Sequence, residues 1–278
     1  MHFEPKAQTL IMILGSNAPE NEADLETQRR TWLKDLSSTQ SYVVLRGLPK
    51  APPSLVLDEL FLPVVESYEN ILAKTILGMK WALQNSNFEI LIRTNVSTYF
   101  PPHKIEKVSH SINKSKLFIG GYVDLCQLPG ETDKADVEYV AGTGIILTRP
   151  TVELLCDIDW NIYSKLPDDL AISIALRDVG IFPTRFRRNN LSQLHIFIPA
   201  LQIRLKTSSV SKLASLRMEN IYRFYRASSV VGKLKWYLVI AINEFRFVLT
   251  NWEEFSGFAM QAGAQSKRLF LRIVRQGR

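Results

Sequence analysis

Short apolar runs alternate with longer amphipathic segments from residue 8 to about residue 180, and this alternation restricts the fold more than any other feature. The runs have the length of strands, and the segments between them carry apolar residues at helical spacing. The expected strands are residues 8–16, 41–47, 88–94, 117–123 and 138–147, and the expected helices are residues 22–36, 66–83 and 167–179. This alternation predicts an α/β fold in which helices flank a sheet.

Two expected strands end in small or polar residues that suit a ligand site. Gly15, Ser16 and Asn17 follow the first strand, and Arg93, Thr94 and Asn95 close the third. Ligands of open α/β sheets bind beyond the carboxyl ends of the strands. We therefore expect both tripeptides at the mouth of one site.

Positive charge is concentrated in the last quarter of the chain. Residues 1–200 hold 20 Lys and Arg against 23 Asp and Glu, a net charge of −3, whereas residues 201–278 hold 14 against 4, a net charge of +10. Aromatic and cationic residues alternate there in three expected helices, residues 211–226, 233–249 and 266–274. We predict a catalytic domain over residues 1–207 and a basic, aromatic helical appendage over residues 208–278.

Composition excludes several classes of protein. Hydrophobic residues make up 46% and charged residues 22%, which is typical of a globular chain and not of a disordered one. Cys126 and Cys156 are too few for a disulfide framework and lack the spacing of a metal site. The start of the chain lacks the pattern of a secretory signal, and no apolar run approaches the ~20 residues that span a bilayer. We expect a cytoplasmic protein. A peripheral position on the cytosolic face of a membrane is the alternative location.

Five separated motifs follow one another in the first 182 residues. They are Leu10–Leu14 with Arg29-Arg30-Thr31-Trp32, Glu66–Thr75 (ESYENILAKT) with Trp81, Phe88–Asn95, Tyr139–Thr148 (YVAGTGIILT), and Pro167–Leu170 with Leu176–Ile181. In this order they resemble the β-1,3-galactosyltransferase / N-acetylglucosaminyltransferase family of glycosyltransferases. The resemblance implies a GT-A type, Rossmann-like mixed sheet flanked by helices, and it does not extend to the appendage.

The resemblance also implies a chemistry. It implies a nucleotide-sugar donor, with UDP as the expected nucleotide, a glycan or lipid-linked saccharide as acceptor, and inversion at the anomeric carbon in polysaccharide biosynthesis. Asp169, with Asp168 beside it, takes the place of the general base. Gly142, Thr143 and Gly144 take the place of a substrate-binding strand, and Lys74, in the most specific motif, is a candidate donor-binding residue. The base of the nucleotide is expected near Gly15-Ser16-Asn17 and the diphosphate near Arg29, Arg30 and Arg93.

The third motif departs from the family at a decisive point. GT-A enzymes bind Mn²⁺ or Mg²⁺ through an Asp-x-Asp, but Arg93-Thr94-Asn95 stands in its place. Arginine keeps its charge and does not ligate metals, and Asn95 offers a single neutral oxygen. Two alternatives follow: either Arg93 contacts the diphosphate directly and a divalent cation is dispensable, or the chain has lost catalysis and binds glycans.

The basic C-terminal helices leave further alternatives open. Basic amphipathic helices with aromatic residues suit an anionic membrane surface, which is where lipid-linked acceptors reside. The same helices could form a lid whose aromatic residues are core. Concentrated positive charge is also compatible with nucleic-acid binding. The family motifs make nucleic acid a less favoured partner than a nucleotide sugar.

Overall fold

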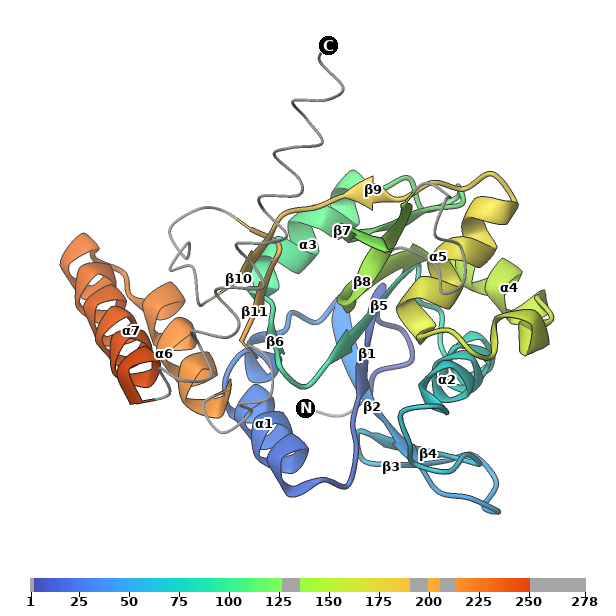
Figure 1. Ribbon diagram of the computed structural model, residues 1–278, viewed down its shortest axis with the longest axis horizontal. Coiled ribbons are helices and arrows are strands. Elements are labelled where there is room, and N and C mark those ends of the chain that lie inside the picture. The colour runs from blue at the N-terminus through green and yellow to red at the C-terminus, as the bar shows by residue number, and fades with distance from the viewer. Residues whose placement is uncertain (1–2, 127–135, 191–199, 206–213, 251–278) are drawn as a thin grey trace, which may run out of the picture. The chain divides into compact units, whose positions relative to one another are not determined.

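The computed structural model of the chain describes residues 3–126, 136–190, 200–205 and 214–250. By compactness the chain divides into two units, residues 1–225 and residues 226–278. The first unit contains a large sheet with helices on both sides (Figure 1). This arrangement confirms the α/β class and the mixed sheet flanked by helices.

The large sheet has eight strands in the order β3-β4-β2-β1-β5-β8-β7-β9. Its strands are β1 (Thr9–Leu14), β2 (Gln40–Gly47), β3 (Ser54–Val56), β4 (Glu59–Leu62), β5 (Ile90–Asn95), β7 (Ile119–Cys126), β8 (Val137–Thr148) and β9 (Thr184–Arg185). The central strands β2, β1 and β5 run parallel, and β8 runs antiparallel to β5. Leu14 lies opposite Asn95, so the carboxyl ends of β1 and β5 meet at the same edge, as their sequences predict.

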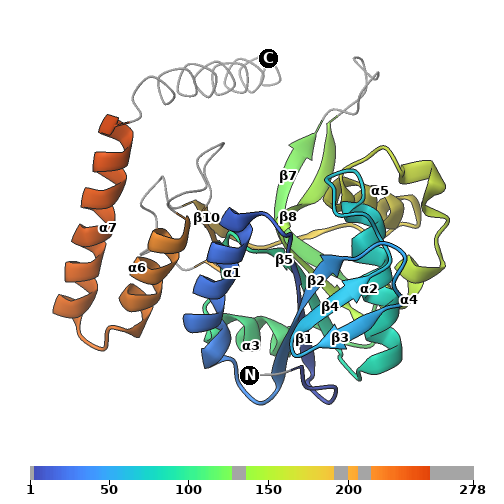
Figure 2. The same cartoon turned by 90° about the horizontal axis from the view of Figure 1, so that it is seen from below.

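Side chains alternate across the sheet and build a core on each face. The helices are α1 (Pro19–Arg30), α2 (Ile71–Asn85), α3 (Pro102–Ser111), α4 (Arg149–Asp157) and α5 (Asp168–Asp178). Leu10 and Met12 of β1 join the core under α2, α4 and α5. The helices α1 and α3 cover the opposite face (Figure 2), where Trp32 and Phe100 pack with ring centroids 5.9 Å apart.

One expected helix begins later than the apolar spacing indicates. The helix expected from Glu66 begins at Ile71. The Glu66 carboxylate instead accepts a hydrogen bond from the Gly47 amide (2.7 Å) and pairs with Lys74, which keeps the segment before Ile71 out of the helix. Tyr68, which helical spacing would align with Leu72 and Thr75, is therefore not on the packed face and is 70% exposed.

The helix expected over residues 22–36 also differs. It is α1 followed by a separate 3-10 turn, Leu33–Asp35. A second 3-10 turn, Trp160–Tyr163, precedes α5. The apolar residues that predicted the first helix are nevertheless buried, because both α1 and the turn face the sheet: Leu25, Trp32, Leu33 and Leu36.

A second, small sheet lies beside the large one in the order β10-β11-β6. Its strands are β6 (Thr98–Tyr99), β10 (Arg188–Asn190) and β11 (Gln202–Arg204). In β11, Arg204 lies opposite Thr98, and Gln202 lies opposite Arg188 of β10. The small sheet thus connects a late part of the chain to the segment that directly follows β5.

Two helices follow the small sheet. They are α6 (Ala214–Arg226) and α7 (Val230–Thr250), where helices over 211–226 and 233–249 are expected; the third expected helix, residues 266–274, lies outside the described residues. In α6, Ser215 donates to Asp24 of α1 (2.8 Å) and Glu219 pairs with Arg30 (2.7 Å). The separation of an appendage at residue 208 stays a prediction.

The helix α7 carries a row of exposed apolar side chains. They recur every three or four residues and so share one side of the helix: Val231, Leu234, Leu238, Ile242 and Phe245. Among the described residues, no helix combines the length and hydropathy needed to cross a membrane. Association with a membrane surface stays a prediction.

Candidate functional site

A cavity of about 930 Å³ opens beyond the carboxyl ends of β1 and β5. This volume lies within the range of small-molecule sites, roughly 300–1,000 Å³. Most residues singled out in the sequence line it: Gly15, Ser16, Asn17, Lys74, Arg93, Asn95, Gly142, Thr143, Asp168 and Asp169. The strand tips and the start of α5 therefore face one shared space.

Two buried cations hold the turn after β1. The Lys74 ammonium, 3% exposed, donates to the Gly15 carbonyl (2.8 Å) and pairs with Glu66. Arg46, equally buried, donates to the Ser16 carbonyl and forms ion pairs with Glu22 and Glu59. Burial lowers the pKa of Lys74, and Glu66 offsets part of that effect. Both carbonyls are thus turned inward, and Lys74 positions the turn.

Arg93 and Asp168 form a buried ion pair at the floor of the cavity. The guanidinium of Arg93 pairs with the Asp168 carboxylate and donates to the Gly142 carbonyl. Thr75 Oγ1 donates to the same Asp168 oxygen (3.1 Å). Arg93 is 3% and Asp168 is 5% exposed. The charge of Arg93 is therefore matched within the protein, at the place where the family resemblance puts a metal site.

Asp169 lies next to this pair and faces the cavity. Its Oδ2 accepts a hydrogen bond from the Gly142 amide (2.8 Å), and its Oδ1 accepts one from the Leu170 amide (2.9 Å). Burial raises the pKa of Asp169 above its ordinary value, the negative charge of Asp168 adds to the increase, and Arg93 and the two amides oppose it. Asp169 is a fixed carboxylate with an elevated proton affinity, which suits a general base.

Gly142 is in contact with both Arg93 and Asp169. A methyl group at its Cα would lie 2.6 Å from Nη1 of Arg93 and 3.1 Å from Oδ2 of Asp169. Its amide and carbonyl bind Asp169 and Arg93 respectively. The absence of a side chain at residue 142 lets β8 approach the strand tip of β5 and the start of α5 together.

The substitution Gly142→Ala is expected to destabilise the fold by about 1–3 kcal/mol, because the added methyl must displace a buried, paired guanidinium. Urea unfolding measures this effect. The native chain is the reference for this variant. Equal unfolding midpoints for Gly142→Ala and the native chain would show that the arrangement around Gly142 adapts freely.

Four predicted site residues do not line this cavity. Arg29 pairs with Asp58 and Glu59, and Arg30 pairs with Glu219 of α6, so neither is brought to the expected diphosphate position. Thr94 is buried and donates to the Thr143 carbonyl (2.8 Å), which fastens β5 to β8. A side chain at Gly144 would collide with Gln202 and Phe100, so this glycine serves packing.

Several lining residues are absent from the sequence-based set. Tyr68, Asp124, Tyr139, Arg188 and Arg204 all line the cavity. Burial raises the pKa of Tyr139 to about 12, so its phenol stays protonated at neutral pH and can donate a hydrogen bond. The sequence gives partial signals for three of them, since Tyr68 and Tyr139 lie in the ordered motifs and Arg188 ends the basic run that begins at Arg185. Nothing in the sequence distinguishes Asp124 or Arg204.

The described residues at the tip of β5 are expected to replace a metal site, and their side chains are engaged in other contacts. Within the described ranges, no group of three or more His, Cys, Asp or Glu side chains is arranged to hold a metal ion. At the strand tip, Asn95 Oδ1 accepts hydrogen bonds from Ser97 and Thr98 and so shapes the turn. The residues present therefore do not fit an Asp-x-Asp type cation site.

No family model and no curated protein matches the chain. Among solved structures, it is similar to the glycosyltransferase GlyE of Streptococcus pneumoniae TIGR4, with 9% identity and a TM-score of 0.45, and to its apo form, with 8% and 0.42. Either likeness covers 84% of this chain and 63% of GlyE, so the chain spans less than two thirds of that protein. A third likeness is to 2-C-methyl-D-erythritol 4-phosphate cytidylyltransferase of Thermus thermophilus, with 13% identity, a TM-score of 0.40, and coverage of 77% of this chain and 99% of that one. Likenesses this distant do not bear on function.

Proposed function

We propose that this chain is a glycosyltransferase of GT-A type that transfers a sugar from a nucleotide sugar, with UDP as the expected nucleotide, to a glycan or lipid-linked saccharide. One observation carries the proposal: the Asp169 carboxylate, with a raised pKa, shares a cavity with the turn after β1 and the tip of β5. The ordered motifs around these residues add support.

In the proposed reaction, the donor lies across the carboxyl ends of β1 and β5, with its base near the turn Gly15-Ser16-Asn17. The acceptor hydroxyl attacks the anomeric carbon from the face opposite the diphosphate. The new bond forms from the hydroxyl oxygen, the bond to the diphosphate breaks, and the leaving group takes the electron pair. Asp169 takes the hydroxyl proton, and the anomeric configuration inverts.

Asp169 is a better base than its neighbour for geometric reasons. Asp168 is buried in its pair with Arg93 and also accepts from Thr75, which leaves it committed to the interior. Asp169 is only partly buried, and the Gly142 amide holds it in place without neutralising its charge. In this scheme Asp168 and Arg93 are positioning residues that hold Gly142 for Asp169.

A calorimetric titration with UDP tests the proposal. We expect saturable binding whose affinity is the same with Mn²⁺ and with a chelator, because the described site residues do not fit a metal ion. Incubation with a set of UDP-sugars is expected to release UDP slowly by hydrolysis, and faster when a suitable acceptor is present. A chain that binds no nucleoside diphosphate would contradict the proposal, and binding that requires Mn²⁺ would contradict its metal-independent form.

A further inference from the structure

Two arginines from the small sheet reach the same cavity. Arg188 belongs to β10 and Arg204 to β11, and these strands pair side by side. Arg204 also lies opposite Thr98 of β6, directly after the tip of β5. Strand pairing therefore places Arg204 opposite the segment that follows β5 and Arg188 on the adjacent strand, although both are about a hundred residues from Asn95 in the sequence.

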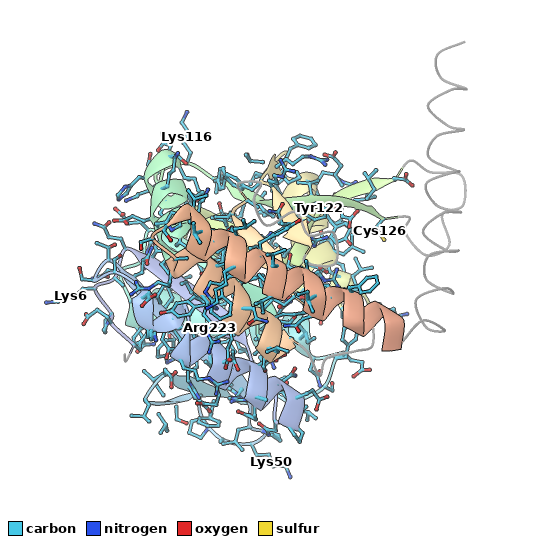
Figure 3. All side chains as sticks on the ribbon, turned by 90° about the vertical axis from the view of Figure 1, so that its left-hand side faces the viewer. Lys6, Lys50, Lys116, Tyr122, Cys126 and Arg223 are labelled. Carbon is cyan, nitrogen blue, oxygen red and sulfur yellow. The ribbon has the colours of Figure 1, made fainter. Side chains whose placement is uncertain are left out.

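Arg188 is half-buried, and its guanidinium has an aromatic partner where the cavity's other inner cations have a carboxylate. Its guanidinium stacks on the ring of Tyr122, 3.7 Å from the centroid, and its Nη1 reaches Thr143 Oγ1 at 3.4 Å. Its Nε, like that of Arg93, is buried without a hydrogen-bond partner. Tyr122, labelled in Figure 3, comes from β7, so two sheets build this position. Stacking leaves the edge of the guanidinium, where its N–H groups point, available to an anion.

The charges of the two arginines are not balanced by a direct ion pair. Among the described residues, no carboxylate lies within 4.0 Å of either guanidinium, whereas Arg46, Lys74 and Arg93 each have one. Burial lowers the pKa of Arg188, the proximity of Arg204 lowers it further, and Asp124 and two tyrosines partly oppose this. An arginine remains charged in spite of such a shift. The half-buried Arg188 and the exposed Arg204 thus bring two like charges to one cavity, where an anion with several negative charges would stabilise them.

We propose that Arg188 and Arg204 bind the diphosphate of the donor and supply the positive charge that a divalent cation supplies in Asp-x-Asp enzymes. The proposal rests on the proposed function, since it names the groups that hold the leaving group of that reaction. Arginine binds phosphate oxygens through two parallel N–H bonds, and such charge-assisted bonds are strong. Fixed cations at the leaving diphosphate also stabilise the charge that develops as the glycosidic bond breaks.

This assignment differs from the expectation drawn from Arg93. That arginine has the expected place at the tip of β5, but its terminal nitrogens bind Asp168 and the Gly142 carbonyl. Binding a diphosphate through Arg93 would require breaking a buried pair. Arg188 and Arg204 require no such loss, because no carboxylate of the described residues lies within 4.0 Å of either guanidinium.

Calorimetry with inorganic pyrophosphate, UDP and uridine, all with a chelator present, tests the assignment. Arg188→Met and Arg204→Met are each expected to weaken pyrophosphate and UDP binding roughly ten- to hundredfold. Uridine, which has no phosphate, is expected to bind all variants equally. Arg185→Met is the matched control, since this neighbouring arginine is exposed, pairs with Glu138 and is absent from the cavity lining.

Thermal unfolding without ligand separates a binding role from a structural one. Arg204 is exposed and is repelled by Arg188, so Arg204→Met is expected to leave the unfolding temperature unchanged or to raise it. Arg188→Met also loses the stacking on Tyr122, so it is expected to lower the unfolding temperature slightly while leaving uridine binding intact. A lower unfolding temperature together with weaker uridine binding would show that the arginines only support the fold, and would overturn the assignment. Unchanged pyrophosphate affinity in both variants, or no pyrophosphate binding by the native chain, would overturn it as well.

The outcomes also separate this inference from the proposed function. If the native chain turns over a UDP-sugar but both variants bind UDP as it does, the transferase proposal stands and the arginine assignment fails. If the variants lose pyrophosphate binding but the native chain turns over no UDP-sugar and binds no UDP, the anion site stands and the transferase proposal fails.

Discussion

Asp169→Asn is expected to lower the rate of glycosyl transfer by roughly 10²- to 10⁴-fold, the usual contribution of a general base. Asparagine keeps an oxygen that can accept the Gly142 hydrogen bond, so the contact with β8 is preserved, although its amide nitrogen cannot accept the Leu170 hydrogen bond. It has no basic oxygen that can take the acceptor proton. UDP affinity should therefore stay close to that of the native chain while transfer is lost.

The measurement is UDP release from the preferred UDP-sugar in the presence of acceptor, with UDP affinity measured in parallel. Asp159→Asn is the matched control, because Asp159 caps the 3-10 turn before α5 and asparagine caps equally well. The control should retain full activity. Transfer at the native rate by Asp169→Asn would exclude Asp169 as the base, and loss of UDP binding would indicate a collapsed site instead.

The raised pKa of Asp169 gives this prediction a second readout. Only the ionised carboxylate accepts a proton, so the rate should rise with pH and reach half its maximum above the ordinary aspartate pKa of about 3.9. The residual activity of Asp169→Asn should not show this rise with pH. The same shift means that the folded chain binds this proton more tightly than the unfolded chain. Ionisation of Asp169 therefore lowers the stability of the native chain as pH rises through the folded-state pKa, and Asp169→Asn should lack this pH dependence.

The part of the site that follows from strand order could be predicted from the sequence. Buried parallel strands have long apolar runs, and their carboxyl ends must meet, so Gly15 and Asn95 come together once β1 and β5 are neighbours. The position of Asp169 at the start of an amphipathic helix is also apparent from the sequence. These features depend on periodicity over six or more residues.

The partners of the charged residues could not be predicted in this way. Strands β6, β10 and β11 have only two or three residues each, too few for a periodic signal, and their pairing decides where Arg188 and Arg204 lie. Likewise the resemblance locates Arg93 at a strand tip, but only the packing of α5 against β8 shows that Asp168 neutralises it. The expected contact of Arg29 with a diphosphate fails for the same reason, since Asp58 and Glu59 bind it first.

The buried pair of Arg93 and Asp168 leads to the largest expected effect on stability. Either Arg93→Met or Asp168→Leu is expected to lower the free energy of unfolding by about 3–5 kcal/mol, because each leaves an uncompensated charge in the interior. The double variant should be more stable than either single variant, since it removes both desolvated charges and fills the space with apolar side chains. Urea unfolding of the four chains forms a double-mutant cycle.

The exposed pair of Arg185 and Glu138 provides the comparison for that cycle. Its side chains are 62% and 53% exposed, so solvent screens their attraction, and Arg185→Met should cost about 1 kcal/mol or less. If Arg93→Met costs no more than this control, the Arg93 guanidinium is hydrated in solution and free to approach a diphosphate. A large cost with strong coupling in the cycle would instead mean that the protein's own carboxylate holds this cation, and that the diphosphate needs its positive charge from elsewhere in the cavity.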